Sequence, residues 1–437
     1  MEGTQTLSAR ALLGLPWALK SIFALFVYCS PLPRAFHIRS AMVLGWAVAL
    51  AALIAIFLRD QSTPYFQDRK LVANVAANGL SHHVVTHRFG VSEYSQAEDG
   101  VFQPVMTKYR VFAMLSYFLL LSVGMDGWDN GGDFDFSLEY TQVMLLAGLM
   151  ALPPVLLLSF SVSETPRERR SLRQSLRETW SLVHNCGLSN VLLCRFMGGV
   201  CAGVSATAVN PVAFYYSGVQ PLNDTVVPFV VLSALNSVDK KGWDVDYRTV
   251  IIVGTIITLV LDGGATLFTI WGLVRSQWLW IGLPVMEAIP SVLDYTISTA
   301  VLREVADPNA HTTTSSLVTS VSFLAGPLGL AVSKCINAQF DVTNEDVMTD
   351  TTPVREQIMA TFFIAYGMQL ASLLWLFALP KHEKDARELK LRDSTSAVCG
   401  AGLLILLSAS LLFVVAVHSL SVFEPTSCLG VSGGKRC

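Results

Sequence analysis

The stretch ALPPVLLLSFSVSETPRERRSLRQSLRETW (151–180) passes from an apolar segment into a polar loop rich in arginine. The arginines of this loop are Arg167, Arg169, Arg170, Arg173 and Arg177. Short loops that carry an excess of Lys and Arg stay on the cytoplasmic side of a membrane. The loop is therefore expected to be cytoplasmic, and it divides the apolar segments of the chain into two sets.

Composition places the chain among membrane proteins. It has 437 residues, of which 52% are hydrophobic and 14% are charged, and its mean hydropathy is +0.50. Soluble domains carry about 25% charged residues. The net charge of −3 and the lack of a basic tract interleaved with aromatic residues argue against nucleic-acid binding.

Motifs that would indicate catalysis or a bound cofactor are weak. His83 and His87 stand four residues apart, which can place two metal ligands on one helix, but no third ligand lies nearby. The chain has no GxxxxGK[ST] phosphate-binding loop. We therefore expect no enzyme activity, no metal and no cofactor.

Apolar segments close to the length of about 20 residues that a bilayer core requires recur along the chain. The strong candidates are 11–29, 39–58, 109–126, 141–161, 186–208, 249–271, 277–303, 314–338, 357–380 and 396–421. Two weaker candidates are 71–86 and 225–238. The pattern predicts an all-α, polytopic transmembrane bundle of about 11–12 spans.

The placement of charged loops indicates whether the two weaker segments cross the membrane. The segment 381–393 is basic like the arginine-rich loop, so an even number of spans must separate the two, and 225–238 has to cross. A crossing by 71–86 keeps Arg34 and Arg39 on the cytoplasmic side, which fits the same rule.

This topology predicts two features outside the membrane. The loop after 186–208 holds Asn223, the first residue of an Asn-x-Thr glycosylation sequence. The tail after 396–421 holds Cys428 and Cys437, which can form a disulfide in an oxidising compartment.

Charged residues occur inside the expected spans, among them Arg195, Asp262, Glu287 and Asp294. Such residues face a bundle interior or an aqueous cavity, because hydrocarbon does not solvate them. Glu287 lies between Pro284 and Pro290, and Asp294 comes about two turns later on the same face, an arrangement suited to a cation or proton relay. The alternative to a relay is a structural role, in which Glu287 makes one helix–helix contact and Asp294 lies near the membrane–water interface.

Arg195 and Asp262 lie on separate spans. They can pair as a structural tie, or Arg195 can hold an anionic substrate, because a guanidinium matches a carboxylate in bidentate fashion. Both interpretations remain open from the sequence.

Several long segments resemble the folate–biopterin transporter family of the major facilitator superfamily, in particular its oomycete branch. These segments are GLPWALK (14–20), NGGDFDFSL (130–138), TAVNPVAFYYSGVQPLND (207–224), TIWGLVRSQWLWIGLPVMEAIP (269–290), DVTNEDVMTDTTPVR (341–355) and EPTSCLGVSGGKRC (424–437). The segment ANVAANG (73–79) is similar to the family's ADVAADG, with Asn74 and Asn78 where the family carries aspartates. The start MEGTQ resembles the residues just after the family's first helix, so the chain is expected to lack that helix.

The resemblance implies two pseudo-symmetric halves around a central cavity, alternating access, and symport of folates or pteridines with protons. The expected organisation is an N-terminal half at 1–161 with a degraded fourth helix, a basic linker at 162–185, a C-terminal half at 186–393, and an additional span and outside tail at 394–437. Candidate roles are a proton-responsive carboxylate for Glu287, an anion contact for Arg195, a counter-charge for Asp262, and cavity lining for Asn74 and Asn78.

Two alternatives remain. The chain can be a transport-incompetent paralogue or an incomplete gene model of the same family, or a membrane scaffold or receptor whose bundle anchors its outside loops. The plasma membrane is the expected location, with an internal membrane as the alternative.

Overall fold

The computed structural model describes scattered positions between residues 7 and 149, and then residues 172–219, 246–280 with 282, 311–378 and 396–434. The chain divides into two compact units, one made of residues 1–18 and 179–437 and the other of residues 19–178.

The regular elements of the described residues are all helical, as the sequence predicts. They are α7 (Leu172–His184), α8 (Cys186–Ala202), α9 (Val209–Tyr215), α11 (Tyr247–Ile270), α13 (His311–Asn337), α14 (Asn344–Thr349), α15 (Thr352–Ser372), η2 (Leu373–Ala378), α17 (Ala397–Val422), α18 (Glu424–Ser427) and η3 (Gly430–Ser432). The helix α7 lies within a segment for which the sequence analysis expected only a polar linker.

Within the described residues, four helical segments are long and apolar enough to cross a membrane: Arg248–Ile270, Ser316–Asn337, Thr352–Phe377 and Ala397–Val422. A shorter apolar helix spans Cys186–Ala202. These helices coincide with the expected spans at 249–271, 314–338, 357–380, 396–421 and 186–208. The prediction of an all-α membrane bundle is confirmed. The expected spans that fall mostly or wholly outside the described residues are 39–58, 71–86, 109–126, 141–161, 225–238 and 277–303.

Polar side chains fix where these helices begin. The Asn185 side chain accepts a hydrogen bond from the Leu188 amide at 3.1 Å, and Asp246 accepts one from the Arg248 amide at 3.0 Å. Such caps satisfy amides that have no partner inside the helix. Thr343 and Asp346 form a reciprocal capping box at the start of α14.

Small residues allow α8 and α13 to pack closely. A Cβ added at Gly329 of α13 would lie 2.5 Å from the carbonyl oxygen of Val200 in α8. The Ser205 amide donates to Ser333 Oγ at 2.8 Å, and Asn337 Nδ2 donates to the Ser205 carbonyl at 3.2 Å. Helices inside a bilayer associate mainly through close packing, because lipid provides little hydrophobic driving force between them. The α8–α13 contact therefore depends on Gly329, which lets the two backbones approach.

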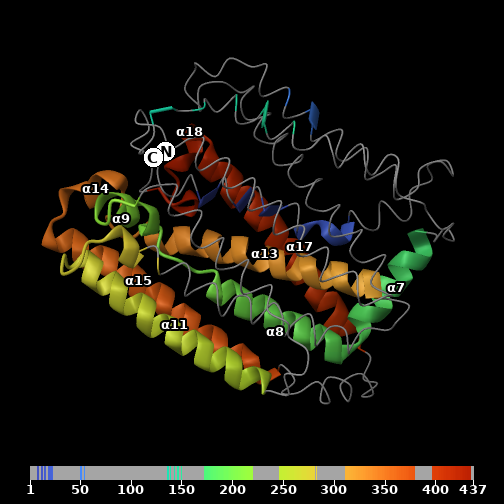
Figure 1. Ribbon diagram of the computed structural model, residues 1–437. Helices are drawn as coiled ribbons and strands as arrows, with labels where there is room; N and C mark the ends of the chain where they lie inside the picture. The colour runs from blue at the N-terminus through green and yellow to red at the C-terminus, as the bar shows by residue number, and fades with distance from the viewer. Residues whose placement is uncertain are drawn as a thin grey trace. The chain divides into compact units, whose positions relative to one another are not determined.

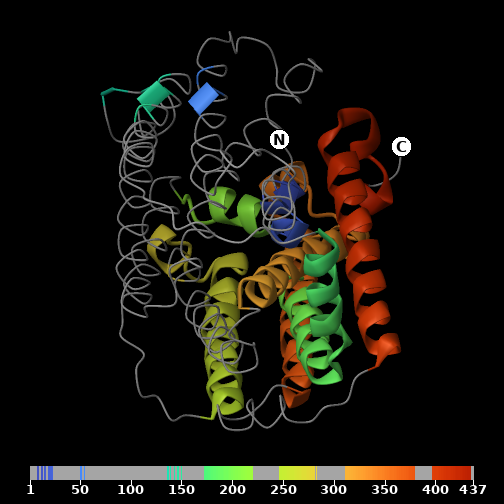
Figure 2. The ribbon, with the colours of Figure 1, turned by 90° about the vertical axis from the view of Figure 1, so that its right-hand side faces the viewer.

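Contacts at both ends of the α11–α15 pair join it to other segments. Figure 1 shows α11 and α15 side by side, and the loops at one end of this pair approach α9 and α14. At the other end, Arg248 Nη2 donates to the Phe377 carbonyl at 2.8 Å, and the Ser396 amide donates to the His184 carbonyl at 3.0 Å. Figure 2 shows α17 along one side of this unit, where it packs against α13 and α8.

Two apolar cores hold the described helices together. One core joins α8, α13 and α17 through buried side chains such as Phe196, Val321 and Val414. The other joins α9, α14 and α15 through Val212, Val347 and Ile358.

Candidate functional site

Asp262 is an acidic residue in the apolar helix α11, and only 6% of it is exposed. The Tyr366 hydroxyl of α15 donates a hydrogen bond to Asp262 Oδ2 at 2.6 Å and lies 3.1 Å from the Thr266 hydroxyl. The tyrosine ring packs over Gly263, where an added Cβ would be in ordinary contact with Tyr366 Cε2 at 3.5 Å. A buried carboxyl is thus held between two spanning helices by neutral hydroxyl groups.

Lys334 of α13 and His418 of α17 form a second buried polar contact, and both residues are 0% exposed. Lys334 Nζ lies 2.9 Å from His418 Nδ1 and also donates to the Ser8 hydroxyl. His418 Nε2 lies 2.9 Å from the carbonyl oxygen of Pro327. Two nitrogen bases therefore meet inside the bundle, at the junction of α13, α17 and the segment around residue 8.

The geometry fixes how protons are arranged in this pair. A carbonyl oxygen only accepts, so His418 Nε2 carries a hydrogen and donates it to Pro327. In a neutral imidazole the other nitrogen is then an acceptor, and Lys334 donates to Nδ1. If both side chains were charged, two positive charges would stand 2.9 Å apart, which like-charge repulsion disfavours. The geometry therefore disfavours a pair in which both groups are charged at once.

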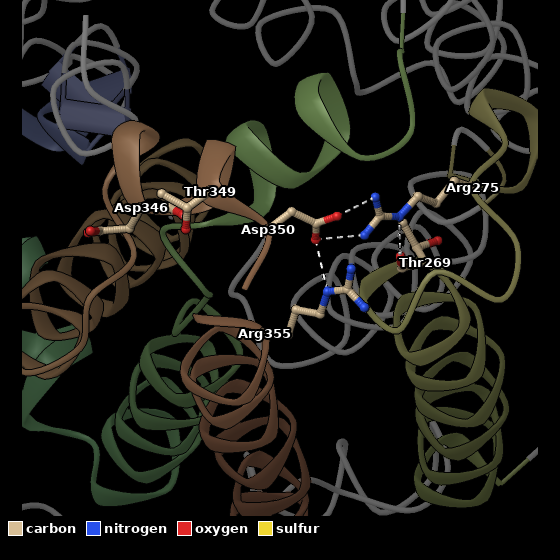
Figure 3. Close-up of polar contacts among 6 residues, drawn as sticks. All are labelled: Thr269, Arg275, Asp346, Thr349, Asp350 and Arg355. Carbon is tan, nitrogen blue, oxygen red and sulfur yellow. Dashed lines mark hydrogen bonds and ion pairs between the residues drawn. The ribbon is translucent and has the colours of Figure 1, made fainter. Parts of the chain in front are cut away.

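Asp350 joins the ends of α11 and α15, as Figure 3 shows. Arg275 holds it with Nη1 at 2.9 Å from Oδ2 and Nη2 at 2.8 Å from Oδ1, and Arg355 Nε lies 2.8 Å from Oδ1. Arg275 Nε also donates to the Thr269 carbonyl at 3.3 Å, and its guanidinium lies 4.3 Å from the Tyr216 ring centre. We call Tyr216, Arg275, Asp350 and Arg355 the arginine–aspartate cluster.

Local backbone structure positions this cluster. Asp350 ends α14 in the left-handed region, with φ 50° and ψ 32°, a conformation that aspartate tolerates better than most residues. This turn directs its carboxylate toward the loop after α11. The cluster thereby joins three of the segments that carry the family resemblance, 207–224, 269–290 and 341–355.

The cluster shifts the protonation of two of its members. Hydrogen bonds from Arg275 hold the pKa of Asp350 well below its usual value, and those from Arg355 act in the same direction. Burial, together with the nearby charge of Asp350, raises the pKa of Tyr216 to about 12. At neutral pH Asp350 is an anion and Tyr216 is neutral.

Some of the predicted site residues lie in the described part of the chain, and the others lie outside it. Asp262 is buried, but its hydrogen-bond partner is Tyr366 of α15 and not Arg195, which lies half-buried in α8. Cys428 is disulfide-bonded, whereas the thiols of Cys186, Cys194, Cys201, Cys335 and Cys399 are free. The remaining predicted residues, which lie outside the described part of the chain, are Asn74, Asn78, Asn223, Glu287, Asp294 and Cys437.

The sequence analysis missed Lys334 and His418. A signal existed, because each is a polar, titratable residue near the end of an expected span, at 314–338 and 396–421. Their pairing could not be read from the sequence, because 84 positions separate them. Tyr366 was missed because one tyrosine in an apolar segment is common.

The tail contains the letters GVSGG (430–434), which fit the pattern GxSxG. In α/β-hydrolases this pattern places a nucleophilic serine on a turn between a strand and a helix. Here Gly430–Ser432 forms the short helix η3 after α18, and no strand precedes it among the described residues. The segment does not have the structural context of a nucleophile.

No family model and no curated protein matches the chain. The solved structure of the human organic anion transporter MFSD10 (TETRAN) is similar, with a TM-score of 0.50 and 13% sequence identity, covering 85% of this chain and 83% of that one. A bacterial homologue of the human lysosomal transporter Spinster, in an inward-facing and occupied conformation, has a TM-score of 0.45 and 15% identity, covering 88% and 90%.

The likeness to MFSD10 extends over most of both chains, and the described helices are apolar and long enough to span a bilayer. The chain is therefore an all-α, multi-pass membrane bundle with the fold of the major facilitators. At this identity the likeness establishes the fold alone.

Proposed function

We propose that this protein is a secondary-active transporter that moves folate- or biopterin-type pteridines across a membrane by alternating access, coupled to protons. The observation that carries the proposal is the pair Lys334–His418, which is completely buried between two spanning helices. Ionisable residues are rare inside spans and mark ion or substrate pathways. The major-facilitator fold supplies the framework for such a pathway.

Proton coupling requires groups that gain and lose a proton inside the bundle. The Lys334–His418 pair supplies two nitrogen bases in contact, and Asp262 adds a buried carboxyl on α11. We assign Glu287 and Asp294 to the same proton-responsive set because the sequence places them inside a proline-interrupted span. In this scheme the charge of the bundle interior changes during the cycle.

The substrate class rests on the sequence resemblance. Folates carry carboxylates and a flat ring with many hydrogen-bonding groups, so a site for them needs a guanidinium and neutral polar side chains. Arg195 is the proposed anion contact, Asp262 is its proposed counter-charge, and Asn74 and Asn78 are the proposed polar lining. We propose the plasma membrane as the location.

Uptake of labelled folate and labelled biopterin into proteoliposomes tests the proposal. We expect accumulation when the external pH is lower than the internal pH, and its loss when an uncoupler dissipates the gradient. A matched variant, Lys334→Met combined with His418→Leu, should transport without dependence on the gradient or not at all. No uptake of either compound by folded protein under any gradient contradicts the proposal and favours a transport-incompetent relative.

A further inference from the structure

The helix α7 carries an apolar stripe that is exposed in the described part of the chain. In its sequence LRQSLRETWSLVH, Leu172, Leu176 and Trp180 recur every four residues, which places them within about 80° of one another around the axis. They are 52%, 49% and 42% exposed. Three large apolar side chains in a row on an exposed helix face indicate a surface that is covered by something else.

Positive charge lines one edge of this stripe. Arg173 and Arg177 each come one position after a stripe leucine, so both project about 100° around the axis from it and adjoin Trp180. Both arginines are exposed, and neither makes an ion pair with another described residue. Gln174 and Glu178, which contact each other at 3.4 Å, occupy the opposite face. The helix is thus apolar on one face, basic along the adjoining edge and polar behind.

The position of α7 in the chain sets it beside the bilayer. Asn185 leaves the helical conformation, with φ −70° and ψ 111°, and its side chain caps the apolar helix α8. Val183 is 0% exposed, and the His184 carbonyl accepts a hydrogen bond from Ser396 at the start of α17. The C-terminal end of α7 is therefore anchored where the apolar helix α8 and the spanning helix α17 begin.

We propose that α7 is an interfacial helix that binds anionic phospholipid on the arginine-rich side of the membrane. Leu172, Leu176 and Trp180 insert at the boundary between headgroups and acyl chains, and Arg173 and Arg177 contact the phosphates. Interfacial helices combine an apolar face with a basic polar face in this way, and tryptophan prefers this depth. The cytoplasmic leaflet supplies the anionic lipid that basic segments attract. This inference does not depend on which solute the protein transports.

Hydrogen–deuterium exchange of the full-length protein in lipid nanodiscs tests the inference. Discs of phosphatidylcholine alone are compared with discs that also contain phosphatidylglycerol, and exchange is followed in peptides that cover 172–184. We expect several-fold slower exchange in the anionic discs. Peptides from α15 serve as an internal reference for folding and should exchange equally in both.

Two variants separate charge from apolar insertion. Arg173→Gln with Arg177→Gln should remove the difference between the two kinds of disc, and Leu176→Gln with Trp180→Gln should speed exchange in both. Gln174→Ala on the polar face is the matched control and should behave like the unmodified protein. Equal exchange of the unmodified protein in both discs overturns the inference. So does protection in detergent that rises with protein concentration, since that result identifies a second copy of the chain as the occupant.

Discussion

Arg275 binds Asp350 through two parallel hydrogen bonds of 2.9 and 2.8 Å, and these residues lie 75 positions apart in the chain. The bidentate pair links the loop after α11 to the turn before α15. Arg355 shares the same carboxylate at 2.8 Å, so one aspartate binds two arginines. The cluster carries a net positive charge at one end of this helical unit.

Replacing Asp350 by Asn should loosen this end of the unit. Asparagine tolerates the left-handed backbone of Asp350, so the change removes the charge and keeps the turn. The pair is about a third exposed, so solvent weakens it, and we expect a loss of roughly 1–2 kcal/mol. Thermal unfolding of the purified protein measures the effect. Glu345→Gln, an exposed carboxylate on α14, is the matched control, and equal shifts for both variants would contradict the role of the cluster.

The same carboxylate should make stability depend on acid. The pKa of Asp350 is lower in the folded protein than in the unfolded chain, so its stabilising contribution is present above the unfolded value of about 3.9. It declines as the pH falls below that value toward the folded pKa. The melting-temperature difference between the unmodified protein and Asp350→Asn should therefore be constant near neutral pH and shrink below about pH 4. A difference that grows on acidification is inconsistent with the lowered pKa.

Lys334 and His418 should show strong energetic coupling in a double-mutant cycle. His418→Leu leaves a buried lysine without its acceptor, and Lys334→Met leaves a buried imidazole nitrogen unsatisfied, so each should cost about 2–4 kcal/mol. The double variant removes both polar groups and should be more stable than the sum of the single effects predicts. Unfolding in detergent mixtures measures all four proteins. Additive effects would show that the two side chains do not interact.

Gly329→Ala should separate α8 from α13. The new Cβ would lie 2.5 Å from a backbone oxygen, which has to move, and we expect a loss of about 1–3 kcal/mol. Gly326→Ala, three residues earlier on the same helix, meets nothing within 4 Å and is the control. Because alanine favours helix over glycine, the control should be neutral or stabilising by up to about 1 kcal/mol. Thermal unfolding of both variants measures the difference between them. Equal destabilisation by Gly329→Ala and Gly326→Ala would contradict the close approach of α8 and α13.

The sequence by itself determined the class of fold. Apolar segments of spanning length and the position of the arginine-rich loop depend on local composition, because hydrocarbon requires every spanning helix to satisfy its own backbone. The expected spans at 249–271 and 396–421 accordingly match α11 and α17 to within two residues at each end. The sequence also marked Asp262 as a residue that had to be buried.

The partners of the polar residues were decided only by the tertiary structure. Asp262 accepts a hydrogen bond from Tyr366, 104 positions away, and Lys334 meets His418, 84 positions away. Helix periodicity tells which face a side chain occupies, but it does not tell which helix packs against that face. That choice depends on close contacts such as the one at Gly329, which are set by the shapes of two surfaces together.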